Sequence, residues 1–294
     1  MKVGILVSMK KKSIHPVAFL RRACDKLGIK SQIVDPSLLS VEIAGSMQSF
    51  FLKGRRFDVD DYCFILRRPE YSNPELLFYR INVIRTLEMS GLTVVNSIEA
   101  FLNAVDKFRT SVLLSMNNIK TPETLVTERG VDAMRYFEKV GKAVVKPVFG
   151  SQGKGMLLID QKDSAWRAFK LQKYYEVPIY IQRFVEHGNR DIRVLVLGDR
   201  VLSAMYRVSK GWKTNIAMGA KPVKAKLSEE IRELALKASR IVGAEVAGVD
   251  IVETPDGLMV LEVNACPEWT GLQQVTDFDI AEEIVKYVVS KAKS

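Results

Sequence analysis

Two carboxylates and an amide lie in one apolar stretch near the end of the chain, at Asp250, Glu262 and Asn264. Apolar neighbours flank both carboxylates, and a charge in such a strand needs a partner because its uncompensated burial is costly. These oxygen ligands suit a hard cation, Mg²⁺ or Mn²⁺, that also binds phosphate oxygens. The chain has only two histidines and no CxxC pair, so a bound metal would rely on oxygen ligands. A solvated polar face on an edge hairpin is the alternative.

The register of the predicted hairpin over residues 246–263 decides whether these side chains meet. If Pro255–Gly257 forms a three-residue turn, Asp250 lies directly opposite Glu262, and Asn264 follows two residues further along the same face. A two-residue or four-residue turn would send Asp250 to the other face of the hairpin. The metal interpretation therefore predicts an odd-length turn, with Gly257 in the left-handed region.

A second group of residues could bind phosphate. Lys146 ends an apolar strand and precedes a loop that contains Gly150, Gly153 and Gly155 and leads into the next strand. Such a loop can bring backbone N–H groups close to phosphate oxygens. It is not a Walker loop, because GxxxxGK[ST] is missing, and not a dinucleotide fingerprint, because a strand follows it. An ordinary flexible hairpin is the alternative.

A third candidate region begins where the apolar strand over residues 179–184 runs into a polar connection. An adenine ring could use the apolar wall, the backbone polar groups and the side chain of Gln182. Glu186 is placed to accept hydrogen bonds from ribose hydroxyls. Loop solvation is the alternative for Glu186 and Asp191, and an edge hydrogen bond is the alternative for Gln182.

Two arginines lie in the apolar strands of one predicted hairpin, which turns at Gly198-Asp199. Arg193 and Arg207 are suited to clamping phosphate or carboxylate groups, although each could equally lie on a solvent face. Asn215, in the glycine-bounded segment 211–219, could join them.

Two patterns of elements must position these residues. Residues 1 to about 95 alternate strands and helices with short connections, which indicates a parallel sheet in an open α/β domain. From about Asn96 the pattern becomes α+β with mostly antiparallel pairing, and Ser97 and Asp106 are predicted to cap two successive helices. The expected strands are 3–7, 31–34, 64–66, 93–95, 123–127, 143–146, 156–159, 179–184, 192–197 and 200–207, and the expected helices are 16–27, 75–89, 98–105, 107–117, 131–140, 164–170, 228–242 and 280–291.

The composition, 47% hydrophobic and 27% charged over 294 residues, is that of a soluble globular protein. No apolar run is long enough to span a bilayer, and Met1–Val7 indicates a buried strand instead of a signal peptide, so a cytoplasmic protein is expected. The net charge of +10 favours acidic partners, or else reflects the charged surface of a heat-adapted protein. No RNA-binding or zinc-finger signature is present, so nucleic acid is not an expected partner.

Together these segments resemble the ATP-grasp superfamily, and within it the RimK-like α-L-glutamate ligases. The matching segments appear in the family's order between about Asn96 and Gln273, whereas the first 95 residues match only as a general α/β domain that precedes the ATP-grasp fold. The matches are Asp106–Thr110, Thr121–Thr124, Val145–Pro147, Gly150–Gly155, Gln182–Glu186, Asp191–Arg193, Ala247–Asp250 and Glu262–Asn264. The resemblance implies a pre-ATP-grasp domain at 1–95, a small lid subdomain at 96–185 and a C-terminal subdomain with the metal site at 186–294, the two α+β subdomains clamping ATP.

The resemblance also implies a role for each residue. Lys107 and Lys146 would contact the phosphates and adenine of ATP, and Glu186 would bind its ribose. Arg193 and Arg207 would act catalytically beside the transferring phosphate. Two Mg²⁺ or Mn²⁺ ions would be held by Asp250, Glu262 and Asn264. The other expected ATP contacts are Ser151, Gln152, Gly153, Gln182, Arg183, Phe184, Val185, Asp191 and Asn215.

The chemistry that the resemblance implies is ATP-dependent amide formation. An acceptor carboxylate attacks the γ-phosphate, giving an acyl phosphate and ADP, and the amine of L-glutamate then attacks the acyl carbon. Metal ions and cationic side chains would offset charge on the transferring group, and Arg193 would stabilise the tetrahedral intermediate. The glycine loop should close over ATP and exclude water.

The loop 265–273 bears on the choice of acceptor. It lacks the Glu-Phe-Lys-Asn signature of the ligases that modify an amino-group carrier protein, and its Pro-Glu-Trp-Thr-Gly sequence is more similar to archaeal cofactor ligases. An acidic small molecule, tetrahydromethanopterin or coenzyme F420, is therefore the favoured acceptor. Modification of ribosomal protein S6 or of a carrier protein, another amino donor, and an ATP-binding regulatory module without turnover stay open. Such ligases often form homo-oligomers, but no motif here indicates one.

Overall fold

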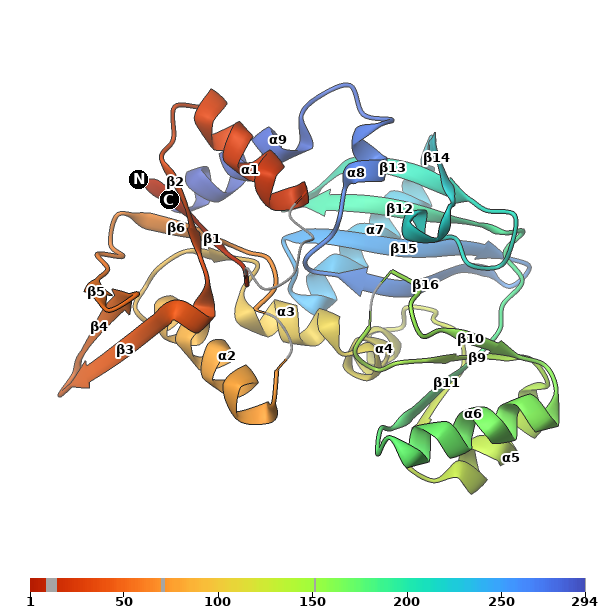
Figure 1. Cartoon of the computed structure of the whole chain (residues 1–294). Coiled ribbons are helices and arrows are strands. Elements are labelled where there is room, and N and C mark those ends of the chain that lie inside the picture. Colours follow the sequence, from red (N-terminus) through yellow and green to blue (C-terminus); the bar gives the residue numbers. More distant parts are fainter. Residues whose placement is uncertain (9–14, 70–71, 151, 294) are drawn as a thin grey trace.

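The computed structural model describes residues 1–8, 15–69, 72–150 and 152–293. Within them the chain forms an N-terminal region, a large antiparallel sheet and a smaller lobe with its own sheet, which lies at the lower right of Figure 1. The predicted change from an α/β to an α+β pattern is confirmed. No helix in the described ranges has the length and apolar character that crossing a membrane requires.

The N-terminal region contains the predicted parallel sheet, in the order β2-β1-β6-β7. Its central strands β1 and β6 are largely apolar because both faces are covered: Val3 and Ile5 pack toward α1, whereas Leu6 and Phe64 pack toward α2. The elements are β1 Lys2–Leu6, α1 His15–Lys26, β2 Ser31–Val34, β6 Tyr62–Leu66, α2 Pro74–Met89 and β7 Val94–Val95.

One part of this region corrects the sequence analysis. Residues 39–56, expected to follow the strand–helix alternation, form an antiparallel three-stranded sheet instead. The Lys53-Gly54 turn has positive φ at both residues, 53° and 75°, as a tight hairpin requires. Most side chains here are exposed, so the sequence lacks the apolar alternation from which strands are predicted. They are β3 Leu39–Ala44, β4 Met47–Leu52 and β5 Arg55–Arg56, preceded by the short helix Pro36–Leu38.

The small sheet, ordered β10-β9-β11-β8, has two faces of opposite character. Val145 and Ile181 point into a core covered by α5 and α6, whereas Lys146, Tyr180 and Gln182 project from the other face. The alternation of side chains along a strand thus turns the polar groups toward the rest of the molecule. The elements are β8 Thr124–Thr127, α5 Gly130–Val140, β9 Ala143–Lys146, β10 Leu157–Ile159, α6 Lys162–Tyr174 and β11 Ile179–Arg183.

The large sheet, ordered β14-β13-β12-β15-β16, is antiparallel throughout. Val194 and Val196 pack under α7, and Leu195 and Leu197 face the cluster around Trp269. Arg193 is on the Leu195 face, two residues further along, where the face becomes polar. The elements are β12 Arg190–Leu197, β13 Arg200–Val208, β14 Lys221–Lys224, α7 Glu229–Val242, β15 Val246–Thr254 and β16 Gly257–Asn264; β14 and the short helices Ile216–Met218 and α8 Thr270–Gln273 were not among the predicted elements.

Two helices that precede the small sheet pack on the large one. The predicted caps are confirmed: Ser97 Oγ accepts from Ala100 N at 3.1 Å, and Asp106 Oδ1 accepts from Phe108 N at 2.9 Å. Ala104 and Leu114 join the core beneath α7. The helices are α3 Ile98–Val105 and α4 Lys107–Met116.

The hairpin β15–β16 has the predicted facing residues but a different turn. Thr254 pairs with Gly257, so the turn has two residues and the predicted three-residue turn is wrong. A bulge between the pairs at Ile251 and Asp250 then shifts the register by one residue, so that Asp250 lies opposite Glu262. Gly257 has the expected positive φ, 101°. The bulge therefore restores the parity that a two-residue turn alone would lose.

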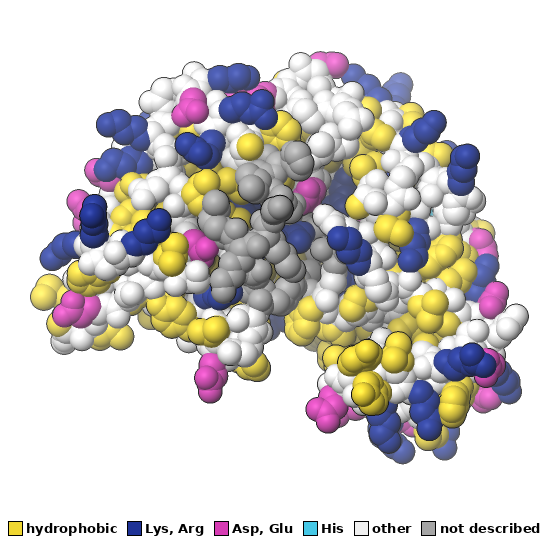
Figure 2. Space-filling model, viewed as in Figure 1, with side chains coloured by type: hydrophobic (Ala, Val, Ile, Leu, Met, Phe, Trp, Pro, Cys, Tyr) yellow, Lys and Arg dark blue, Asp and Glu magenta, His cyan; other side chains and the backbone are white. Residues whose placement is uncertain are grey.

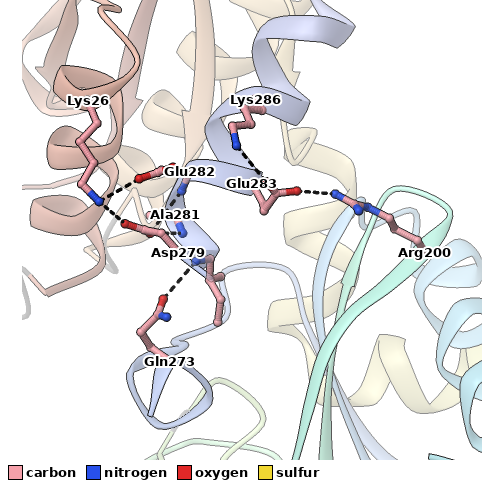
Figure 3. A network of polar contacts seen from close by, with 9 residues as sticks. Lys26, Arg200, Gln273, Asp279, Ala281, Glu282, Glu283 and Lys286 are labelled. Carbon is pink, nitrogen blue, oxygen red and sulfur yellow. Dashed lines mark hydrogen bonds and ion pairs between the residues drawn. The ribbon is translucent and has the colours of Figure 1, made fainter. Parts of the chain in front are cut away.

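The C-terminal helix α9, Ile280–Lys291, returns to the N-terminal region beside α1. Figure 3 shows Lys26 of α1 reaching Asp279 at 3.2 Å and Glu282 at 2.8 Å, while Arg200 of β13 reaches Glu283 at 2.7 Å. Such exposed ion pairs contribute at most about 1 kcal/mol each. The buried apolar cluster shared by β1, α1, α9 and β12 is thus the main attachment between the N-terminal region and the large sheet.

Candidate active site

A cavity of about 80 Å³ lies between the polar face of the small sheet and the polar end of the large sheet. Its walls come from segments far apart in the chain, because α4, β9, β11, β12, β13, β15 and β16 all contribute. Many of the residues expected to contact ATP or metal line it: Lys107, Lys146, Gln182, Arg183, Phe184, Val185, Asp191, Arg207, Asn215, Asp250 and Glu262.

Lys146 is a buried amine whose hydrogen-bond partner is neutral. Its Nζ donates to Gln182 Oε1 at 2.6 Å, and Gln182 Nε2 donates in turn to Thr124 Oγ1 at 2.9 Å and Tyr180 Oη at 3.2 Å. Burial lowers the pKa of Lys146 to about 8, although Glu262 opposes this shift. The acids nearest to this amine, Glu262 and Asp250, act on it only at longer range. A bound phosphate group would place an anion in direct contact with it.

Four buried charges alternate along the polar face of the large sheet. Asp191 accepts from Arg207 Nε at 2.7 Å and from Arg207 Nη2 at 2.5 Å, and from the Thr214 hydroxyl at 2.6 Å. Asp250 faces two arginines, with Oδ2 2.8 Å from Arg207 Nη2 and Oδ1 2.8 Å from Arg193 Nε. Burial alone would lower the pKa of Arg207, but Asp250 and Asp191 raise it above its ordinary value. Arg207 is buried and the Arg193 side chain is only 12% exposed, so the solvent-face alternative is excluded.

The predicted metal ligands fit a hard cation in their chemistry. Asp250 Oδ1 is buried and receives no well-aligned hydrogen bond, and Glu262 makes no hydrogen bond or ion pair with any described residue. Asn264 Oδ1 accepts from Cys266 N at 2.9 Å, which holds the amide in place. The described residues contain no group of three His, Cys, Asp or Glu side chains that could hold a metal, so the amide would have to complete the set.

The glycine loop lies against the segment 211–219, which connects β13 to β14. Lys107 Nζ donates to Gly150 O at 2.7 Å, and Lys213 Nζ donates to Met156 O at 2.8 Å, so the loop is held at both ends. Gly153 has φ +71°, and a Cβ there would lie 2.3 Å from Asn215 Oδ1. Gln152 also has positive φ, 62°, whereas Ser151 lies outside the described residues.

Several predicted residues do not line this cavity. Glu186 is exposed and pairs with Lys142 at 2.8 Å, and Gln152 and Gly153 stay in the loop. Arg193 is paired with Asp250, and its buried Nη1 has no hydrogen-bond partner among the described residues. Asn264 lines a second cavity on the N-terminal side.

The sequence analysis missed several lining residues. His187, Trp212, Lys213 and Thr214 border the cavity, and the Trp212 ring packs edge-on against Phe184 with centroids 6.4 Å apart. Three of these residues lie in the glycine-bounded segment 211–219, from which the sequence analysis selected only Asn215. A loop without periodicity gives no indication of which side chains turn inward.

Comparison with known proteins identifies this arrangement. A family model described as a RimK-like ATP-grasp domain matches residues 104–288. A tetrahydromethanopterin:α-L-glutamate ligase of Methanococcus maripaludis is 35% identical over 279 residues, which are 93% of this chain and 94% of that protein. An α-aminoadipate–LysW ligase of Saccharolobus solfataricus is 37% identical over 214 residues, covering 70% of this chain and 76% of that one.

The fold agrees with these sequence matches. The ATP-grasp ligase PsnB, solved in complex with a minimal precursor, Mg and ADP, superposes with a TM-score of 0.75 at 21% identity, over 99% of this chain and 98% of that one. The resemblance, the fold class and the enzyme class expected from the sequence are therefore confirmed. The chain belongs to the RimK-like ATP-grasp family, and it is a ligase.

Proposed function

We propose that this ligase joins L-glutamate to a carboxylate of tetrahydromethanopterin, using ATP and magnesium. The observation that carries the proposal is the single cavity in which Lys146 and Arg207 meet Asp250 and Glu262. Cations and acids interleaved in this way suit a nucleotide triphosphate that arrives with metal ions. The acceptor is proposed from the similarity to the M. maripaludis enzyme, and coenzyme F420 is the second candidate that the sequence favours.

The proposed nucleotide contacts follow from the walls of the cavity. Lys107 and Lys146 bind phosphate oxygens, and Glu186 turns from Lys142 to the ribose. Arg207 lies beside the transferring phosphate. Gln182, Arg183, Phe184 and Val185 border the adenine, and Asp191 and Asn215 support the phosphate side. Gln152 and Gly153, in the loop beside the cavity, cover the nucleotide.

The metal ligands in the proposal are Asp250, Glu262 and Asn264, which hold two Mg²⁺ or Mn²⁺ ions. These ions supply positive charge that polarises phosphate oxygens. Asp250 also fixes Arg193 and Arg207 by ion pairs, so the cations beside the reacting groups are oriented before substrates bind.

In the proposed reaction an acceptor carboxylate oxygen forms a bond to the γ-phosphorus as the bond to ADP breaks. The nitrogen of L-glutamate then attacks the acyl carbon, phosphate departs, and the amine loses its proton to solvent. Arg193 Nη1, buried and without a partner among the described residues, is the donor that we assign to the oxyanion of the second step. Closure of the loop over residues 150–155 keeps water from the acyl phosphate.

ADP release and mass spectrometry test this function. Tetrahydromethanopterin, coenzyme F420 and a ribosomal S6 peptide are each incubated with ATP, magnesium and L-glutamate. Acceptor-dependent ADP and a product heavier by one glutamyl residue are expected with tetrahydromethanopterin. Tight ATP binding without any product would favour a regulatory module, and a product with another added mass would change the amino donor.

The organisation of the chain completes the proposal. We assign the pre-ATP-grasp domain to 1–95, the small subdomain to 96–185 and the C-terminal subdomain to 186–294. Limited proteolysis with and without an ATP analogue tests the boundary near residue 185. A cytoplasmic location fits the proposed substrates and stays a prediction. Oligomeric state is a separate measurement.

A further inference from the structure

A second cavity, of about 320 Å³, adjoins the first at Glu262 of β16. It is enclosed by α2, α3 and the ends of β1 and β6, and Glu262 lines both cavities. Most of its wall is apolar, with Leu77, Phe78, Ile81 and Phe101 among the contributing side chains. A cavity of this kind suits an organic molecule and not a nucleotide phosphate.

One buried cation in this wall has no ion-pair partner among the residues that the structure describes. Arg67 is 6% exposed, and its Nη2 donates to Pro267 O at 2.8 Å and to Cys266 O at 3.4 Å. Its guanidinium lies 5.0 Å from the ring centroid of Trp269, and among the described residues it forms no ion pair, Glu268 acting on it only at longer range. Burial lowers the pKa of Arg67. The protein thus leaves the charge of Arg67 uncompensated at contact distance, unlike that of Arg193 or Arg207.

We infer that this cavity receives the acceptor, with an apolar or aromatic section between α2 and α3 and one carboxylate paired with Arg67. The inference rests on the proposed function, because it names where the acceptor of that reaction binds. Charge complementarity carries it: a carboxylate supplies what Arg67 lacks, and a planar fork of donors suits it.

The other charged groups of the cavity are consistent with this orientation. Arg68 adds a second cation, and Glu262 and Glu268 add acids. The reacting carboxylate reaches the side where Glu262 and Asn264 lie, and the ions proposed there offset its repulsion from Glu262. Arg67 also holds the backbone of the loop 265–273 through residues 266 and 267, so the segment that the sequence connected with acceptor choice is fixed by the proposed anchor.

A binding experiment tests the cavity without requiring turnover. The probes are 4-phenylbutyrate and its uncharged counterpart 4-phenylbutanamide, titrated by ligand-observed NMR with magnesium and a non-hydrolysable ATP analogue present to fill the nucleotide cavity. The acid is expected to bind about tenfold more tightly than the amide, and Arg67→Gln should abolish that difference. Equal affinity of acid and amide for the native enzyme, or no saturable binding of either, overturns the inference.

A second variant separates binding from folding. Phe78 is 63% exposed on α2, so Phe78→Ala should fold and should weaken both probes about fivefold by removing apolar contact. The matched control is Met89→Ala, on the same helix and 81% exposed but outside the cavity, which should leave both affinities unchanged. Unchanged binding in Phe78→Ala would place the probes elsewhere and remove the inference even if Arg67→Gln misfolds.

The kinetic experiment distinguishes this inference from the proposed function. Arg67→Gln should raise the KM for tetrahydromethanopterin about tenfold while the KM for ATP stays within about twofold. Turnover with an unaltered acceptor KM removes the inference and leaves the ligase function standing. Charge-dependent probe binding without any ligation has the opposite meaning, since the cavity is then occupied as inferred but the proposed reaction fails.

Discussion

The two cavities that meet at Glu262 compensate buried charge in different ways. On the nucleotide side, Arg207 is paired with Asp191 and Asp250 at 2.5 to 2.8 Å, so the protein itself meets the cost of burying the cation. On the N-terminal side, Arg67 contacts backbone carbonyls and an aromatic ring, and no described acid lies within ion-pair distance of it. The paired network is suited to keeping a fixed geometry, whereas the unpaired cation is suited to selecting an anionic ligand.

The overall charge does not make this distinction. Figure 2 shows Lys and Arg side chains scattered among acidic ones over the visible face, so the net charge of +10 is not gathered into one patch there. Selectivity for acidic substrates is better sought in the few buried cations, where the low dielectric strengthens each interaction.

The largest expected effect tests the residue shared by the two cavities. Glu262→Gln should reduce acceptor-dependent ADP release by more than about 100-fold, because it removes a charged ligand from the proposed metal site. The control is Glu253→Gln on β15 of the same hairpin, where the carboxylate only pairs with Arg190 near the surface. Circular dichroism checks the fold of both, and near-normal turnover in Glu262→Gln would remove the metal assignment.

Breaking the paired network should cost both rate and stability. Asp191→Asn removes the carboxylate that fixes Arg207, so kcat should fall about tenfold and the free energy of unfolding by about 3 kcal/mol. Asp199→Asn, which disturbs only the exposed pair with Arg240, should change neither. Urea denaturation and ADP release measure the two quantities; an Asp191 variant with native stability would mean that the network is not needed to compensate Arg207.

The buried amine on the nucleotide side predicts a pH effect. The pKa of Lys146 is about 8 in the folded protein and 10.5 ordinarily, so the unfolded chain binds more protons between these values. Stability should therefore rise with pH across the window from about 8 to 10.5, by on the order of 3 kcal/mol. Lys146→Met should lose this rise, measured by urea denaturation with EDTA present, while Lys142→Met, at an exposed lysine, keeps it. Equal slopes in all three proteins would contradict the lowered pKa.

The smallest effect concerns the loop that covers the nucleotide. Gly153→Ala places a Cβ against Asn215 and should raise the KM for ATP about fivefold, because the loop must shift away. Gly141→Ala is the matched control: its φ is +73°, but nothing lies within 4 Å of the added Cβ. The two variants share the backbone cost of about 1 kcal/mol, so only the difference in KM reports the contact. Identical KM values would mean that the loop does not lie over the nucleotide during turnover.

Periodicity and capping made much of the fold predictable. The helix at Ile98–Val105 and the strand at Ala143–Lys146 were bounded correctly because a capping side chain or an apolar run marks each end. The sheet at 39–56 was missed because its side chains are largely exposed and give no alternation. The prediction that Asp250 faces Glu262 is correct, but it assumed a three-residue turn where the hairpin has a two-residue turn and a bulge. A bulge leaves no local signature in the sequence.

The site was predictable to the extent that its residues lie in strands. The sequence nominated Lys146 and Gln182 at the polar ends of apolar strands, and the pairing of those strands places both side chains in the cavity. Arg67 and Trp212 depend on contacts between segments about 200 and 30 residues apart, which no local pattern encodes. Which buried charges pair with each other is likewise decided by tertiary contacts. The sequence therefore indicated Arg193 and Arg207 as candidates but not that they pair with Asp250 and Asp191.

The bulge in β16 has a consequence for insertions and deletions. The pairs from Thr254–Gly257 to Ile251–Val260 follow one register, and the pairs from Asp250–Glu262 onward follow the next, with Leu261 as the residue between. Deleting Leu261 would remove the bulge and bring all the pairs into one register, in which Asp250 still lies opposite Glu262. The facing of the proposed metal ligands thus depends on the turn and the bulge taken together, and not on the length of either alone.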